Sequence, residues 1–198
     1  MALVFNGSNN TIGGLAVGGL PNGVVDTDVL AADAVTAAKS HIAGSILQVQ
    51  VGTNDTQSEQ TTSGTDAYTI LSQAITPKAA SSKILIMAEL YGGLDGNYNG
   101  LGLLLYRDTT NIGVAAANSS VARFNATWQR GHNTERVNLA TVFYLDSPST
   151  TSAVTYYVKA QDANADGGSF QVNRTANWSQ NTAHCATASH IILMEVAG

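Results

Sequence analysis

Two stretches decide the fold, Lys83-Ile-Leu-Ile-Met87 and Gly102-Leu-Leu-Leu-Tyr106, because each is apolar at almost every position. A strand covered on one face alternates apolar and polar residues, whereas a strand covered on both faces is apolar throughout. The two stretches therefore predict strands that are buried on both faces. We expect a neighbouring subunit to provide the second cover.

Further short apolar segments run from residue 45 to the C-terminal end, separated by clusters of turn-forming residues such as Asp95-Gly-Asn97. The expected strands are Ser45–Val51, Ala67–Thr76, Lys83–Tyr91, Gly100–Arg107, Ile112–Ala116, Ala122–Arg130, Val137–Leu145, Ala153–Gln161, Ser169–Arg174 and Ala188–Val196. Short strands with turns at this spacing predict an all-β sandwich, most simply a jelly roll.

The first part of the chain has a different composition. Glycine recurs through residues 1–24, and glycine at this density opposes both helix and strand. The apolar residues between the glycines need shelter that the segment cannot provide. A disordered tail is one interpretation. An arm that folds against a partner is favoured, because a solvated tail contains fewer apolar and more charged residues. The expected anchoring residues are Phe5, Ile12, Leu15, Val17, Leu20, Val24, Val25 and Leu30.

Residues Asp26–Lys39 predict a short helix that follows this arm. Asp26 or Thr27 can cap its first turn, and Lys39 lies near its end, as the helix dipole favours. Its apolar side is mostly alanine, which suits close packing against copies of itself. We expect three parts: an anchoring arm with this helix (1–44), a first strand and a linker (45–65, the linker being Gly52–Thr65), and a C-terminal β-sandwich knob (66–198).

The charge of the chain narrows the classes of function. Charged residues make up 12% of the chain, and the net charge is −5. Lys and Arg form no cluster, so the sequence lacks the basic surface that nucleic acid requires. No apolar run approaches the ~18–20 residues of a membrane span, and the N-terminal residues lack a signal-peptide pattern. We therefore expect synthesis in a reducing cytoplasm. The single cysteine, Cys185, excludes an intrachain disulfide.

Two groups of residues are candidates for metal binding. The run Asp162-Ala-Asn-Ala-Asp-Gly167 matches the first half of a calcium loop, with Asp162, Asn164 and Asp166 as candidate ligands. Its twelfth position is Asn173 where a bidentate Glu is expected, so the residues favour a hairpin turn. The histidines and Cys185 fit no tetrahedral zinc spacing, which favours core or surface histidines. We expect no cofactor.

Catalytic motifs are absent from the sequence. It contains no Gly-x-Ser-x-Gly and no His-Glu-x-x-His, and the glycine-rich run 93–102 lacks the Lys of a phosphate loop. We therefore expect that the protein is not an enzyme. Two segments, 125–130 and 174–181, each place a Trp among amides and an Arg, as sugar-binding surfaces do. Burial of both Trp rings is the favoured alternative. The candidate glycan-binding residues are Tyr98, Trp128, Arg130, Arg174 and Trp178.

One long segment resembles a known family. Gly13-Gly-Leu-Ala-Val-Gly-Gly-Leu-Pro-Asn-Gly-Val-Val-Asp-Thr-Asp-Val-Leu-Ala-Ala-Asp-Ala-Val-Thr-Ala-Ala-Lys39 resembles a segment near the start of many bacteriophage fibre and head-decoration proteins. The block Ile75-Thr-Pro-Lys-Ala-Ala-Ser-Ser-Lys-Ile-Leu-Ile-Met87, with the closing strand Ser189–Val196, is similar to their C-terminal knob. The resemblance implies a trimeric knob with a tumour-necrosis-factor-like jelly roll, located in a virion assembled in the host cytoplasm.

Taken together, the residues and the resemblance predict a non-enzymatic, homotrimeric virion protein whose residues 1–40 bind another protein of the capsid or tail. Two placements stay open. The knob is a tail fibre or adhesin that touches a host surface glycan, or it is a capsid decoration protein (a cement protein or head fibre) that stabilises the shell. A free lectin or a polysaccharide-degrading enzyme is a further alternative, and it would act without particles.

Overall fold

The computed structural model of this chain describes residues 4–6, 11–13, 42–62, 67–94, 101–117, 119–128, 137–162, 168–176 and 184–198. The chain divides into two units, Met1–His41 and Ile42–Gly198. In the first unit the described residues form two short strands, β1 (Val4–Asn6) and β2 (Thr11–Gly13), which pair antiparallel.

The β1–β2 pair corrects the expectation that the glycine-rich start forms no strand. Two of the predicted anchoring residues, Phe5 and Ile12, lie opposite each other in this pair. The residues between the strands are Gly7-Ser-Asn-Asn10, which are types that favour turns. Aromatic and β-branched residues therefore occupy the strands and turn formers separate them. The predicted helix Asp26–Lys39 lies outside the described residues, as do the other anchoring residues: Leu15, Val17, Leu20, Val24, Val25 and Leu30.

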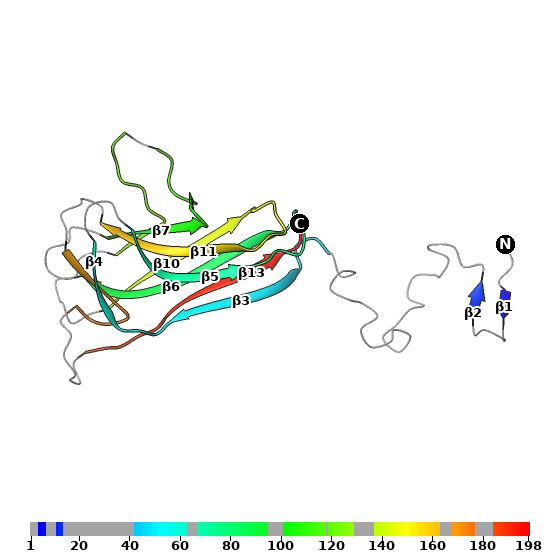
Figure 1. The fold of residues 1–198 in the computed structure, drawn as a ribbon, viewed down its shortest axis with the longest axis horizontal. Helices are drawn as coiled ribbons and strands as arrows, with labels where there is room; N and C mark the ends of the chain where they lie inside the picture. The colour runs from blue at the N-terminus through cyan, green and yellow to red at the C-terminus, as the bar shows by residue number, and fades with distance from the viewer. Residues whose placement is uncertain are drawn as a thin grey trace. The chain divides into compact units, whose positions relative to one another are not determined.

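The second unit is a sandwich of two antiparallel sheets (Figure 1). The first sheet has the order β3 (Ile46–Asn54), β13 (Ser189–Val196), β6 (Lys83–Leu94), β12 (Gly168–Val172) and β4 (Ser58–Thr62), and β10 (Asn138–Asp146) also pairs with β6. The second sheet has the order β5 (Tyr68–Ile75), β11 (Val154–Asp162), β7 (Leu101–Arg107) and β8 (Thr110–Ile112), and β9 (Ala126–Trp128) also pairs with β7.

The connections between the long strands give this sandwich a jelly-roll topology. The strands β5, β6 and β7 alternate between the sheets, and so do β10, β11 and β13. Both β10 and β13 pair with the same residues of β6, so the first sheet runs β3–β13–β6–β10 on one side of the core. Two antiparallel layers whose successive long strands cross from one layer to the other are typical of a jelly roll. The prediction of an all-β sandwich is confirmed.

The expected linker Gly52–Thr65 is wrong for two of its segments, 52–54 and 58–62, which lie in strands. Strand β3 continues to Asn54, and Ser58–Thr62 forms β4. Among the described residues β4 pairs with β12 alone, which places β4 at the edge of the sheet. The Thr, Ser and Gln side chains that suggested a linker suit such an edge, where polar residues discourage pairing with other chains.

Two expected strands are shifted or shortened by a tight turn and a loop. The strand expected over Ile112–Ala116 is β8, at Thr110–Ile112, because the chain reverses at residues 108 and 109. Asp108 has a φ of 50° in this turn, a left-handed conformation that Asp adopts more readily than most residues. The strand expected over Ala122–Arg130 shortens to β9.

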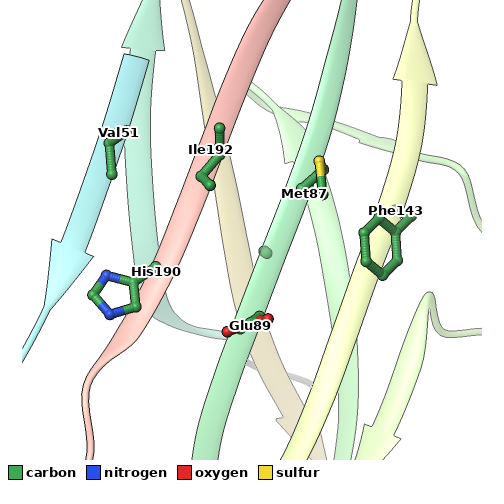
Figure 2. Close-up of a pocket in the computed structure, with 7 residues that line it drawn as sticks. Val51, Met87, Glu89, Phe143, His190 and Ile192 are labelled. Carbon is green, nitrogen blue, oxygen red and sulfur yellow. The ribbon is translucent and has the colours of Figure 1, made fainter. Parts of the chain in front are cut away.

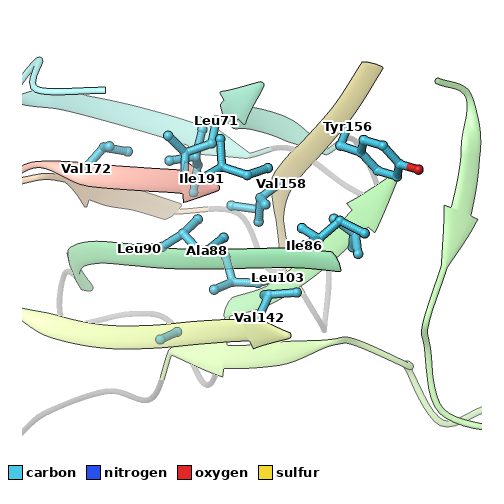
Figure 3. Packing of buried hydrophobic residues seen from close by; sticks show 14 of the residues in the cluster. Leu71, Ile86, Ala88, Leu90, Leu103, Val142, Tyr156, Val158, Val172 and Ile191 are labelled. Atoms are coloured by element: carbon cyan, nitrogen blue, oxygen red, sulfur yellow. The ribbon is translucent and has the colours of Figure 1, made fainter. Parts of the chain in front are cut away.

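The core lies between the two sheets (Figure 3). From Ile84 to Leu90 every second residue of β6 is buried, and β11 and β13 show the same alternation. Such a pattern covers one face of each sheet only. Within the single chain the alternate residues Leu85 and Met87 are incompletely covered, so the cover on the second face of Lys83–Met87, expected from a neighbouring subunit, stays a prediction.

Strand β7 is covered on both faces, but its own chain provides the cover. Leu104 is buried although it points away from the core cluster. A Cβ on the neighbouring outward position, Gly102, would lie 2.0 Å from the Phe124 ring, so that ring packs directly on the strand. Asn125, next to Phe124 in the chain, binds to β7, since its side-chain amide oxygen accepts a hydrogen bond from the Leu105 backbone N–H at 2.8 Å. A neighbouring subunit is therefore not needed at β7.

A buried polar group joins the two sheets. Arg107 on β7 donates to both carboxylate oxygens of Asp146 on β10, at 2.9 and 3.1 Å. The Tyr156 hydroxyl on β11 donates to the same carboxylate at 2.7 Å. Burial, and next the hydrogen bond to Asp146 and its charge, raise the pKa of Tyr156 above its usual value. The phenol therefore remains a donor throughout the ordinary pH range.

A second buried carboxylate closes the C-terminal strand. Glu195 is fully buried and accepts hydrogen bonds from the Gln48 amide at 2.6 Å and the Lys78 backbone N–H at 2.7 Å. Burial alone would raise its pKa. The dipole of the nearby Ser82 hydroxyl and the hydrogen bonds from Gln48 and the backbone outweigh that effect and lower the pKa below its usual value.

Because its folded-state pKa is lowered, Glu195 stabilises the fold above pH 4.5, its usual pKa, and this stabilisation disappears as the pH falls through the folded-state value. Glu195→Gln is expected to reduce the free energy of unfolding by about 1–3 kcal/mol at pH 7, because charge-assisted hydrogen bonds are lost. Urea denaturation from pH 7 to pH 3 should show the difference from wild type shrinking with acid. Asp55→Asn, at an exposed position, is the control. A pH-independent difference would contradict this role.

Candidate protein-protein interface

The outward face of the first sheet is apolar over four neighbouring strands. Cross-strand neighbours form one row of apolar residues, and a second row follows two residues along each strand. The first row is Val51, Ile192, Met87 and Phe143, and the second row is Val49, Met194, Leu85 and Leu145. We call these eight residues and their flanking neighbours Ile46, Val196, Tyr91 and Leu139 the apolar face. Figure 2 shows the first row on β3, β13, β6 and β10.

Large side chains on this face are exposed in the single chain. Phe143 is 61% exposed and Val51 is 56% exposed. The most exposed members stand on the outer strands of the row, β3 and β10, and those on β13 and β6 are half-buried between them. A contiguous apolar patch of this kind on a soluble domain is typical of a surface that binds another protein.

A polar row borders the apolar rows at one end. It consists of Thr53, His190, Glu89 and Thr141, again one residue from each strand. Thr53 Oγ1 and His190 Nδ1 lie 3.1 Å apart, within hydrogen-bond distance. A hollow of about 300 Å³ lies between this row and the first apolar row, lined by Val51, Met87, Ala88, Glu89, Phe143, His190 and Ile192 (Figure 2). An apolar hollow with a polar border matches the anatomy of protein interfaces.

The outward face of the second sheet has a different character. On β7 and β11 the neighbouring outward residues Tyr106 and Tyr157 flank Lys159, whose Nζ lies 4.5 Å and 5.4 Å from the two ring centres. An ammonium over aromatic rings is stable in contact with water. The sandwich therefore has one aromatic and charged outward face and one apolar outward face.

The structure corrects the glycan-binding prediction at Trp128. This ring is 1% exposed and packs in the core, 6.4 Å from the Phe170 ring between centres. A Cβ on Gly92 would lie 2.5 Å from the indole, so only glycine allows the ring to lie flat there. An indole enclosed in this way has no free face for a sugar, and the alternative of burial holds for Trp128.

The remaining candidate glycan residues are not brought together among the described residues. Arg174 is engaged by its neighbours: it donates to the Gln171 side-chain oxygen at 2.6 and 2.8 Å and pairs with Glu59 at 3.3 Å. These contacts orient the guanidinium along the sheet surface. Tyr98, Arg130 and Trp178 lie outside the described residues.

The candidate metal residues are likewise separated. Asp162 is buried at the end of β11, while Asn164 and Asp166 lie outside the described residues. Asn173 is buried with a φ of 59°, and its side chain bonds to the Asn54 carbonyl at 2.7 Å and the Ser189 hydroxyl at 2.6 Å. Asn173 therefore fastens β12 to its neighbours. In the described part of the chain no three His, Cys, Asp or Glu side chains gather where a metal could bind.

No helix within the described residues has the length and apolar character needed to cross a bilayer. The single cysteine, Cys185, is exposed and has a free thiol.

The apolar face was only partly visible in the sequence. The apolar run Lys83–Met87 indicated that β6 needs cover on both sides, and this holds for Leu85 and Met87. The contribution of β10 was missed, because Leu139, Phe143 and Leu145 alternate with the buried residues of that strand and look like ordinary strand composition. Apolar residues at both the even and the odd positions of β10 are the signal that could have revealed it.

The described residues define an antiparallel β-sandwich with an exposed apolar face. No protein-family model and no curated protein matches the chain. Among solved structures, the chain is similar to a chain in the structure of infectious bursal disease virus, Gt strain. The two are 14% identical, with a TM-score of 0.40, and the match covers 76% of this chain and 40% of that chain. It is also similar to the VP2 subviral particle of the same virus, with 16% identity and a TM-score of 0.37 over 76% of this chain and 33% of that chain. The chain thus spans well under half the length of these viral chains.

Proposed function

We propose that this protein is a structural component of a bacteriophage particle: a homotrimeric, tumour-necrosis-factor-like knob joined to another virion protein through residues 1–40. The observation that carries the proposal is the apolar face, because a large exposed apolar surface suits assembly with other protein subunits. The resemblance of Gly13–Lys39 to the start of phage fibre and decoration proteins supports the attachment through the N-terminal residues.

The attachment is tested by deletion of residues 1–40. The core of the sandwich is formed by residues between Ile70 and Leu193, so the truncated chain is expected to fold and stay soluble. It should be missing from purified particles, because it lacks the apolar arm residues that would bind the virion. Western blotting of particles, with the full-length chain as the matched control, measures this. Incorporation of the truncated chain at normal levels would refute the proposed anchor.

The two placements, tail adhesin and capsid decoration, differ in what the knob must bind. An adhesin needs a ligand surface, yet among the predicted glycan residues Trp128 is in the core and Arg174 is held by Gln171 and Glu59. Of the two placements, these contacts favour a capsid decoration protein over a host-binding fibre. The number of copies per particle separates them, because a fibre is present in a few sets and a decoration protein in many.

A further inference from the structure

We infer that the apolar face is the docking surface for a second copy of this chain. The inference rests on the proposed function for the number of copies, and it adds the contact that holds them together. The first apolar row forms the centre of the contact, and the row of Thr53, His190, Glu89 and Thr141 forms its polar border.

The size of the face suits contact between subunits. Four strands spaced ~4.8 Å apart, followed over the nine residues from Lys83 to Tyr91, cover about 19 Å by about 27 Å, or roughly 500 Å². A stable interface buries about 800 Å² on each partner. The apolar face alone therefore supplies more than half of the surface that a lasting contact requires, before any contribution from its polar border.

The charges on the face fit a copy of the same chain. Around the apolar face the four strands place two outward charged residues, Lys83 and Glu89, so this side of the sheet has no net charge. The whole chain carries −5. A neighbouring copy in a ring of three can therefore pack on this face without the repulsion between like charges that the remaining surfaces would cause. A partner selected by charge would require a charged face.

The hollow beside the first row provides the place for an anchoring side chain. It lies between Phe143 and Met87 on one side and His190 on the other, and most of its lining is apolar. Apolar side chains that enter such hollows supply much of the binding energy of an interface. Phe143 on β10 and Val51 on β3 stand at the two margins of the row, so a neighbour approaching from either margin reaches the same hollow.

The test is sedimentation equilibrium of the full-length chain, whose single-copy mass is 20.5 kDa. Wild type is expected to have about three times this mass. Phe143→Glu buries a charge in the contact and is expected to weaken association about hundredfold or more, which gives a single copy at micromolar concentration. The matched control is Val121→Glu, since Val121 is 64% exposed away from this face and its variant should keep the wild-type mass.

Folding of each variant is checked by cooperative urea unfolding, and Val51→Glu at the opposite margin repeats the test if Phe143→Glu does not fold. A monomeric wild type, or a Phe143→Glu variant that folds and keeps the wild-type mass, overturns the inference. The inference fails alone if the wild-type protein is trimeric and enters particles, and the folded Phe143→Glu variant keeps the trimer mass. The proposed function fails alone if the protein self-associates through this face but is found in no particle.

Discussion

Trp128→Ala is expected to lower the free energy of unfolding by about 3–5 kcal/mol, which is the cost of removing a fully buried Trp ring from a core. The ring fills the space above Gly92 and against Phe170, and neither neighbour can move into the cavity without breaking the pairing of β6 with β12. Guanidinium denaturation followed by far-UV circular dichroism measures the loss.

The matched variant Trp128→Phe keeps most of the apolar volume and should lose less than half as much stability. These two variants also separate the core role of Trp128 from the glycan role that the sequence suggested. A Trp128→Ala protein with wild-type stability and reduced binding to host cells would contradict burial as the function of this residue.

Asp146→Ala is expected to cost about 3 kcal/mol of stability. The substitution leaves the Arg107 guanidinium without its carboxylate partner and the buried Tyr156 hydroxyl without its acceptor. Removing one partner of a buried pair is costly because the remaining charge stays uncompensated. The estimate lies at the lower end of the usual range, since the Arg107 side chain is 26% exposed and water can reach it in part.

A double-mutant cycle identifies the origin of this loss. Tyr156→Phe removes the hydroxyl donor and should cost about 1 kcal/mol in the wild-type background. In the Asp146→Ala background the same substitution should cost less, because the hydroxyl no longer has its acceptor there. Equal costs in the two backgrounds would show that the Tyr156–Asp146 hydrogen bond does not stabilise the contact between the sheets.

The long strands were predictable because buried apolar residues alternate with less buried residues along them. β10, β11 and β13 each begin one residue after the expected start, and β6 begins where expected. Strand β4 was not predictable, because its Ser, Glu, Gln and Thr residues owe their strand conformation to pairing with β12 and not to their own propensity. The cover over β7 was missed for a similar reason, since it comes from Phe124, which is distant along the sequence from the surface it covers.

The residues of the candidate site were harder to predict from the sequence than the strands of the fold. A Trp among amides looks the same in a sequence whether its ring is exposed or buried, and at Trp128 the neighbouring glycine on β6 decides the outcome. The apolar face required the register of four strands that are far apart in the sequence. Its first row runs from Val51 to Ile192, Met87 and Phe143, and Val51 and Ile192 are 141 residues apart. No local pattern carries that information, although the two-sided apolar character of β6 pointed to it.

Two of the three methionines, Met87 and Met194, lie on the apolar face, so their oxidation by hydrogen peroxide reports whether the face is covered. If copies of the chain pack on this face, both residues oxidise much more slowly in the wild-type protein than in Phe143→Glu at the same concentration. Equal rates in the two proteins, followed by mass spectrometry of the Met87 and Met194 peptides, would mean that the face stays open to solvent.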